Sequence, residues 1–295
     1  MSLSFNGLGN EGRLGNQMFQ YASLRGIAAN RGFNWIIPPE SASRYDNYGL
    51  FDCFELKNCG EKNIGESNYS TQEYRVMHFL DHLHNEVPDN INLSGMYQTE
   101  KYFENIKDSL REDFTFKTGY LDPCKEFLSS IEGDPIFLHV RRGNPNITGR
   151  RGEKWSYQVV QEYHPLCKKE YYLEALKQFP DDVPVIVVSD LIDWCKKQDW
   201  LQDDRFYFSD ASYQTFGDGA SVPYIDLCLM SLCKGAIIAN SSLSWWGAWL
   251  QNDSGKVIAP DPWFGSAYSH YDMSDLIPSR WTKIYNDPSF VEPEK

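Results

Sequence analysis

A cluster of basic residues follows an apolar segment near the middle of the chain. Residues 135–140, PIFLHV, lead into Arg141 and Arg142, and five basic residues with one acidic residue between Arg141 and Lys154 give this stretch a charge of +4. The whole chain has 28 Lys and Arg against 41 Asp and Glu, a net charge of −13. Arginine binds phosphate oxygens through two nitrogens and stays charged at every physiological pH. The pattern therefore indicates a site for a doubly charged anion at the end of a strand. A solvated basic loop would account for the charge but not for its position.

A second group of polar residues follows another apolar segment, GAIIA at residues 235–239. An asparagine and three serines are followed by three tryptophans, which predicts a strand, a polar turn and a helix. Hydroxyl groups and backbone N–H groups at a helix N-terminus attract anions. The residues offered to an anion here are Asn240, Ser241, Ser242, Leu243 and Ser244. The alternative is structural, with serine and asparagine as helix caps and the tryptophans in the core.

A glycine-rich segment near the start, GRLGNQ from Gly12, could bring the backbone close to a ligand. Its glycines permit tight turns, and Arg13 and Asn16 add a charged and a neutral donor. An ordinary helix start capped by Asn16 is the alternative. The preceding residues also complete a G-x-G-x-x-G pattern that is typical of nicotinamide-dinucleotide-binding oxidoreductases. The ribose-binding acid would then be Glu40, but it follows Gly12 by 28 residues rather than by about 20, and the helix is expected to begin after Gly15.

Three histidines, His78, His82 and His84, lie close to Asp81 in the sequence. If this segment is helical, His78 and His82 share a face and could hold a metal ion. Zinc sites need three or four ligands, and the rest of the chain supplies no clear set. We therefore expect a half-exposed helix and no metal site.

Short, continuous apolar runs alternate with helical stretches along the chain. Such runs are typical of parallel strands covered on both faces, so the sequence predicts a doubly wound α/β fold. The expected strands are 3–7, 34–38, 135–140, 183–190, 235–240 and 256–260, and the expected helices are 17–30, 169–178, 192–198, 224–233 and 244–250. Residues 41–132 show few clear strands. We expect domains at 1–132 and 133–275, with 276–295 as a polar tail that is frayed or laid across the surface.

The composition narrows the class of protein further. Hydrophobic residues make up 41% and charged residues 23%, as in ordinary globular proteins, and the 15% of aromatic residues suits sugar stacking as well as core packing. The negative net charge opposes binding to nucleic acid, and no apolar run approaches the roughly 18 residues of a membrane helix. The seven cysteines form no C-x-x-C pair and the N-terminus shows no signal peptide, so we expect reduced thiols and a cytoplasmic location.

Taken together, GRLGNQMFQYA, HVRRG and NSSLSWWGAWL resemble the α-1,2-fucosyltransferases of glycosyltransferase family 11 over residues 12–260. VVSDLIDWCKK, residues 187–197, resembles the second donor-domain motif of the wider fucosyltransferase group. The resemblance implies a GT-B fold, two Rossmann-like domains with the donor site between them and the acceptor on the side of the first. It also implies transfer of fucose from GDP-fucose to the 2-hydroxyl of a terminal β-galactoside in a bacterial or viral surface glycan. The transfer would invert the anomeric carbon and need no metal or other cofactor.

The resemblance also implies roles for individual residues. Arg141 becomes the main diphosphate clamp, with His139 and Arg142 shaping the end of the strand, while Arg13 and Asn16 close over the fucosyl and acceptor groups from the other domain. The donor-binding residues implied by the later motifs are Ser189, Asp190, Asn240, Ser241, Ser242, Leu243 and Ser244. Asp226 would accept from the N1 and N2 donors of guanine.

Two positions depart from the family pattern, and the general base is unassigned. Asn144 replaces the acid of H-x-R-x-G-D, and Leu191 replaces the second acid of S-D-D. Glu11 and Glu153 lie in suitable loops, but a mechanism without a base is also open. The alternative from another class is a nucleotide-sugar or glycan-binding protein without catalysis, which would not release GDP from GDP-fucose.

Overall fold

The computed structural model describes residues 1–9, 12–40, 49–56, 70–74, 77–143, 157–209, 214–215, 221–222, 224–251 and 255–291. Contacts divide the chain into two compact units. Unit 1 contains residues 1–121, 213–224 and 271–279, and unit 2 contains residues 122–212, 225–270 and 280–295. The domain limits expected from the sequence stay a prediction.

Unit 1 contains a parallel four-stranded sheet in the order β2-β1-β4-β3. Its strands are β1 (Ser2–Ser4), β2 (Asn34–Ile36), β3 (Ser70–Tyr74) and β4 (Ile91–Gly95). Its α-helices are α1 (Leu14–Arg31), α2 (Gly49–Cys53), α3 (Asp81–Glu86) and α4 (Lys107–Asp113), with 3₁₀ turns at Glu100–Tyr102 and Glu104–Ile106. A short antiparallel pair, β8 (Gln214–Thr215) with β9 (Ser221–Val222), also belongs to this unit, and α5 (Thr118–Ser129) begins in it and ends in unit 2.

Helix α1 is the longest helix of unit 1 and most of its residues are buried. It ends at Gly32, whose φ of 64° is the left-handed conformation that glycine adopts without strain. In its middle, Gly26 lets the helix approach the turn at Tyr102, because a Cβ there would lie 2.0 Å from the carbonyl oxygen of Tyr102. Nearer the start of the helix, Gln20 Nε2 donates to the carbonyl oxygen of Gly95, the last residue of β4, at 3.0 Å.

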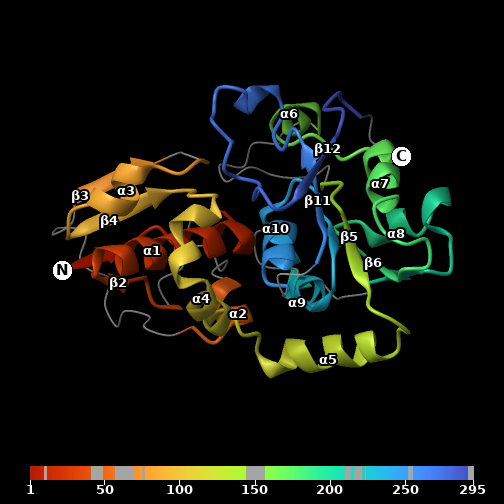
Figure 1. Cartoon of the computed structure of the whole chain (residues 1–295), viewed down its shortest axis with the longest axis horizontal. Helices are drawn as coiled ribbons and strands as arrows, with labels where there is room; N and C mark the ends of the chain where they lie inside the picture. Colours follow the sequence, from red (N-terminus) through yellow and green to blue (C-terminus); the bar gives the residue numbers. More distant parts are fainter. Residues whose placement is uncertain are drawn as a thin grey trace. The chain divides into compact units, whose positions relative to one another are not determined.

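Unit 2 contains a parallel six-stranded sheet in the order β12-β11-β10-β5-β6-β7. The strands are β5 (Ile136–Val140), β6 (Val185–Ser189), β7 (Phe206–Phe208), β10 (Ala236–Ile237), β11 (Val257–Asp261) and β12 (Thr282–Tyr285). The helices are α6 (Tyr157–Tyr163), α7 (Lys169–Leu176), α8 (Ile192–Cys195), α9 (Tyr224–Leu232) and α10 (Ser242–Trp249), with 3₁₀ turns at Asp199–Leu201 and Ser266–Tyr268. α7 and α8 lie on one side of this sheet and α9 and α10 on the other (Figure 1).

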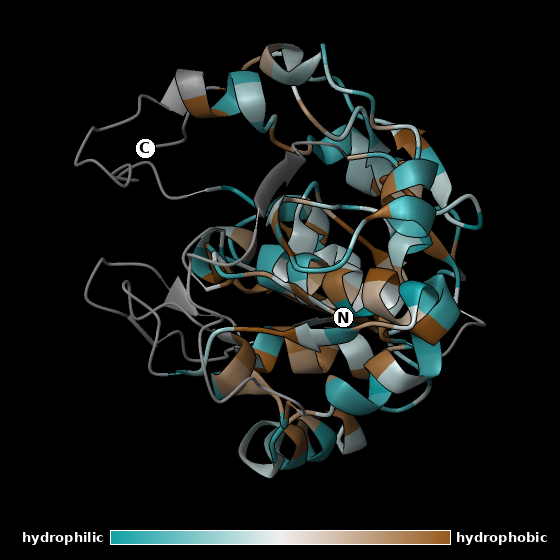
Figure 2. Cartoon of the chain, turned by 90° about the vertical axis from the view of Figure 1, so that its left-hand side faces the viewer, coloured by the Kyte–Doolittle hydropathy of each residue, from teal (hydrophilic) through white to brown (hydrophobic). Residues whose placement is uncertain are grey.

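The strand order of unit 2 reverses beside β5. From β5 the chain adds β6 and β7 on one side, and it then returns to add β10, β11 and β12 on the other side. Right-handed crossovers that change direction place their helices on opposite faces, which explains the two helical layers. Every residue of β5 and β6 is buried, as expected for central strands, while the helices carry both hydrophobic and hydrophilic residues (Figure 2). In such sheets ligands bind beyond the carboxyl ends of the strands at the reversal point, here between β5 and β10.

The apolar runs predicted as strands are confirmed at β1, β2, β5, β6, β10 and β11, and the five expected helices are present. Residues 41–132 were expected to hold few strands, and their described part contains β3 and β4; β4 was not predicted and pairs with both β1 and β3 inside the sheet. α1 begins at Leu14 rather than after Gly15. No helix within the described residues is long and apolar enough to cross a membrane.

Candidate active site

Arg141 follows the last residue of β5 and lies at the reversal point of the unit 2 sheet. Its Nη1 donates to the carbonyl oxygen of Asn240, which follows β10, at 3.0 Å. Asn240 is buried, and its Nδ2 donates to the carbonyl oxygen of Pro165 at 2.7 Å. The hydrogen bonds thus hold one nitrogen of the partly exposed Arg141 guanidinium across the ends of two neighbouring strands, where a bound anion is expected.

Arg142 faces the opposite way. Its guanidinium is buried and lies 4.1 Å from the ring centroid of Trp194 in α8. Its backbone N–H donates to Asp190 Oδ1 at 2.8 Å, and the N–H of Gly143 donates to Asp190 Oδ2 at 2.9 Å. Asp190 therefore holds the turn after β5, in which Gly143 has a φ of 74°. Ser189 is buried, and its Oγ accepts from the N–H of Leu191 at 2.9 Å.

Two histidines lie beside Arg141. His139 is buried in β5, and burial together with the charge of Arg141 lowers its pKa to about 3. The same two causes lower the pKa of His164, which follows α6, to about 3. The His164 ring packs against Phe264 and Tyr268, with centroids 5.4 Å and 6.1 Å away. Both rings are therefore neutral at physiological pH, and the Nδ1 atom of each has no hydrogen-bond partner among the described residues.

The turn after β10 leads directly into α10. Ser241 precedes the helix in extended conformation, and its side chain does not cap the first turn. Ser244 is fully buried, and its Oγ lies within hydrogen-bonding distance of the carbonyl oxygens of Ala239 and Ser241, at 3.3 Å and 3.2 Å. Ser242 and Leu243 are partly exposed at the helix start. The positive end of the helix dipole therefore lies in the same turn as Asn240, next to the Arg141 guanidinium.

The tryptophans of α10 belong to the core. Trp245 and Trp246 are fully buried with an edge-to-face contact at 5.1 Å, and Trp249 lies 5.1 Å from Trp246. The structural alternative for these rings is confirmed. They anchor the helix whose N-terminus faces the end of the sheet.

Asp226 on α9 is buried, with 1% of its surface exposed. Ser209, which follows β7, donates its hydroxyl to Asp226 Oδ1 at 2.7 Å. Ser209 did not stand out in the sequence, because no motif surrounds it. This hydrogen bond joins Asp226 to the end of β7 and not to the Arg141–Asn240 group.

Arg13 and Asn16 lie in unit 1, at the start of α1. Arg13 is exposed and occupies the N-cap position, so the alternative in which Asn16 caps the helix is wrong. Asn16 Oδ1 instead accepts from Nε2 of the buried Gln98, which follows β4, at 2.8 Å. Gln98 was missed in the sequence because it lies in the segment that was expected to be irregular.

Several residues singled out from the sequence cannot be placed. Glu11, Asn144 and Glu153 lie outside the described residues, so the general base stays unassigned.

The three histidines do not share a helical face, since α3 begins at Asp81, after His78. Within the described ranges no three histidine, cysteine, aspartate or glutamate side chains gather as metal ligands.

Two α/β units with parallel sheets, one with a guanidinium at its reversal point, fit a glycosyltransferase of the GT-B type. The chain belongs to glycosyltransferase family 11, which it matches over residues 4–285. It is 30% identical over 300 residues to an α-1,2-colitosyltransferase of Escherichia coli, covering 92% of this chain and 96% of that protein. It is 27% identical over 213 residues to the O-antigen biosynthesis glycosyltransferase WbnK of the same species, covering 70% and 66%. Galactoside α-(1,2)-fucosyltransferase 1 of Aotus azarae is 25% identical over 264 residues, covering 84% and 66%.

Two solved structures share the fold. The α-1,6-fucosyltransferase NodZ, in a crystal soaked with GDP-fucose, gives a TM-score of 0.52 at 11% identity, covering 88% of this chain and 95% of that one. POFUT1 in complex with GDP-fucose also gives 0.52, at 12% identity, covering 88% and 97%. The GT-B fold expected from the sequence is confirmed, and so is the expected class of enzyme, a glycosyltransferase.

Proposed function

We propose that the chain transfers fucose from GDP-fucose to the 2-hydroxyl of a terminal β-galactoside, with inversion at the anomeric carbon. The observation that carries the proposal is the Arg141 guanidinium, held by Asn240 at the reversal point of the unit 2 sheet. Two relatives support the proposed sugar and linkage, because one is an α-1,2-colitosyltransferase and another is a galactoside α-(1,2)-fucosyltransferase.

In the proposed reaction the bond between fucose and the β-phosphate oxygen of GDP breaks, and negative charge builds on the departing diphosphate. Arg141 and the start of α10 meet this charge, so their interactions are stronger in the transition state than with the bound donor. Since His139 and His164 are neutral, Arg141 carries the positive charge among these three described side chains. No metal ion is part of the proposal, since guanidinium and helix dipole supply the electrostatic stabilisation.

The guanine is assigned to Asp226. Guanine presents N–H donors at N1 and N2, which suit a carboxylate, and Ser209 fixes one oxygen of Asp226 at 2.7 Å. A hydrogen bond from Ser209 orients the carboxylate without neutralising it. The proposal therefore favours GDP-sugars over UDP-sugars.

A second donor is favoured by the similarity to the colitosyltransferase. Colitose lacks the 3-hydroxyl group of fucose, so both sugars could leave the same GDP with the same phosphate contacts. Only a contact to the 3-hydroxyl distinguishes the two donors. A site that hydrogen-bonds this hydroxyl discriminates strongly against the sugar that lacks it.

The test is an assay of the purified protein with GDP-fucose, GDP-colitose and UDP-galactose, each with an array of β-galactosides. GDP release and the linkage of the product, read by nuclear magnetic resonance, are the measurements. We expect an α-1,2-linked product with GDP-fucose. If a product forms only with GDP-colitose, the donor is GDP-colitose and not GDP-fucose. Binding of GDP-fucose without release of GDP with any acceptor or with water would support the non-catalytic alternative.

A further inference from the structure

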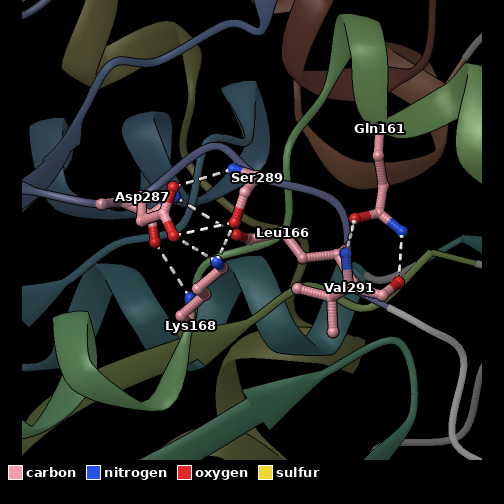
Figure 3. Close-up of polar contacts among 7 residues, drawn as sticks. Gln161, Leu166, Lys168, Asp287, Ser289 and Val291 are labelled. Atoms are coloured by element: carbon pink, nitrogen blue, oxygen red, sulfur yellow. Dashed lines mark hydrogen bonds and ion pairs between the residues drawn. The ribbon is translucent and has the colours of Figure 1, made fainter.

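The last described residues of the chain are held by hydrogen bonds rather than frayed. After β12, residues 286–291, here called the C-terminal strap, lie against the loop between α6 and α7 (Figure 3). The N–H of Asn286 donates to the carbonyl oxygen of Asp261 at 2.8 Å, which continues the pairing of β12 with β11. The strap therefore begins as an extension of the sheet.

Asn286 is the buried contact of the strap, with 1% of its surface exposed. Its Nδ2 donates to the carbonyl oxygen of Leu166 at 3.2 Å, and its Oδ1 accepts the N–H of Lys168 at 2.9 Å. One amide side chain thus satisfies a backbone acceptor and a backbone donor of the same loop. Replacing it leaves both backbone groups without this partner, which destabilises the loop.

Further contacts hold the strap at its surface. The ammonium of Lys168 contacts the carboxylate of Asp287 and the hydroxyl of Ser289. Gln161 in α6 forms two hydrogen bonds with the backbone of Val291, at 2.8 Å and 2.9 Å (Figure 3). These groups close the strap over the loop, while Asn286 alone enters the buried region.

The same loop also contacts Asn240, the partner of Arg141, through Pro165, the residue before Leu166. The carbonyl oxygen of Pro165 accepts from Asn240 Nδ2 at 2.7 Å, and the carbonyl oxygen of Asn240 accepts from Arg141 Nη1 at 3.0 Å. A continuous series of hydrogen bonds and short backbone links therefore leads from Asn286 to the guanidinium. The members between them are backbone groups of the loop and the buried Asn240, which takes part through its side chain and its carbonyl oxygen.

We propose that Asn286 is a positioning residue that fixes Arg141 through the Pro165–Lys168 loop and Asn240. The inference rests on the proposed function, in which Arg141 stabilises the departing diphosphate. Asn286 touches no substrate; it restricts where the Asn240 carbonyl, and hence the guanidinium, can lie. A displacement of about 1 Å at a catalytic group can cost a hundredfold in rate.

A double-mutant cycle tests this coupling. Asn286→Ala should lower turnover at saturating GDP-sugar about ten- to a hundredfold, less than the loss of the Arg141 fork itself. In the Arg141→Lys background, the same change should lower turnover by less than about threefold, because the group it positions is already absent. If Asn286→Ala does not fold, Asn286→Ser, whose hydroxyl can keep one of the two bonds, enters the same cycle.

Gln251→Ala is the matched control. The Gln251 amide also makes two buried backbone contacts, to the carbonyl oxygens of Met230 and Gly235, but near the amino end of β10. It should cost stability in the same way and leave turnover within about twofold of the parent. Equal loss of turnover in Gln251→Ala and Asn286→Ala would mean that general destabilisation explains both.

A spectroscopic measurement separates this inference from the proposed function. The Nε–H signal of Arg141 in ¹⁵N-arginine-labelled protein, assigned by its loss in Arg141→Lys, should shift or broaden in Asn286→Ala and not in Gln251→Ala. If the parent releases no GDP from any GDP-sugar, the proposed function fails. If the parent is active and Arg141→Lys is impaired, the positioning role alone fails when the two losses multiply independently or when the Arg141 signal is unchanged.

Discussion

Arg141 and Arg142 are adjacent in the chain, but they point to opposite sides of β5, and a lysine at each position separates their roles. Arg141 uses Nη1 to bind the carbonyl oxygen of Asn240 at 3.0 Å, and a guanidinium has further nitrogens that can bind a phosphate at the same time. Lysine has a single nitrogen and cannot maintain both geometries, although it keeps the charge. Losing a charge-assisted contact of this kind costs about 3–4 kcal/mol in the transition state, or about a hundred- to a thousandfold in turnover.

Arg142 supplies the comparison. Its guanidinium stacks on Trp194 at 4.1 Å and is buried. Arg142→Lys therefore loses a stacking contact worth about 0.5–2 kcal/mol of stability, with turnover within about threefold of the parent. The assay is turnover of both variants at saturating GDP-fucose, with folding checked by circular dichroism. Near-parent turnover in Arg141→Lys together with collapse in Arg142→Lys would refute the assignment of the clamp.

Three further predictions concern the guanine contact, the buried histidines and metal ions. Ser209→Ala should weaken GDP binding about fivefold by calorimetry, because Asp226 loses a hydrogen bond worth about 1 kcal/mol, and Asp226→Asn should weaken it more; unchanged affinity in both would remove the pair from the site. His139 and His164 have pKa values lowered to about 3 in the fold from the ordinary 6.5, so the unfolded state binds more protons as the pH falls below 6.5. Between pH 7 and pH 5, each histidine should lower the free energy of unfolding, measured by urea titration, by about 2 kcal/mol. His164→Phe should remove about half of this joint pH dependence. An unaltered pH dependence in His164→Phe would contradict the assignment of a neutral His164. Turnover should survive EDTA, and a loss restored by Mg²⁺ or Mn²⁺ would reverse that expectation.

The strands could be predicted from the sequence where they are buried on both faces. β5 and β6 are continuous apolar runs, and every residue in each is buried. β4 was missed because only alternate residues are fully buried. Its polar Asn92 binds residues near the start of the chain: Oδ1 accepts from the hydroxyl of Ser4 and the N–H of Asn6. The residues of β4 alternate between apolar and polar, which is typical of a half-buried strand, so β4 lacks the continuous apolar run by which β5 and β6 were predicted.

The sequence predicted the site residues that lie in motifs, but not the distant residues that they contact. The motif and its place after a strand indicated Arg141. Adjacent side chains on a strand point to opposite faces, so only one of the two arginines could be expected to face the site. The partners that define each role, Asn240 for Arg141 and Trp194 for Arg142, are 99 and 52 residues distant in the sequence. Ser209 stands in no motif, so nothing short of the fold could place it beside a carboxylate. Whether these residues bind a donor stays a prediction.

Unit 1 is discontinuous in the chain, because residues 271–279 belong to it. Within that segment, Asp275 accepts the N–H of Phe79 at 2.9 Å and pairs with the ammonium of Lys101. A ribosome delivers a protein from its N-terminus, and continuous domains fold in that order as they emerge. Here unit 1 lacks Asp275 until residues 122–212 and 225–270 of unit 2 have been synthesised. A prematurely terminated product that stops before residue 271 would leave both units unfinished, since it also lacks β12 and Asn286 of unit 2. Residues 271–291 thus contribute to both units.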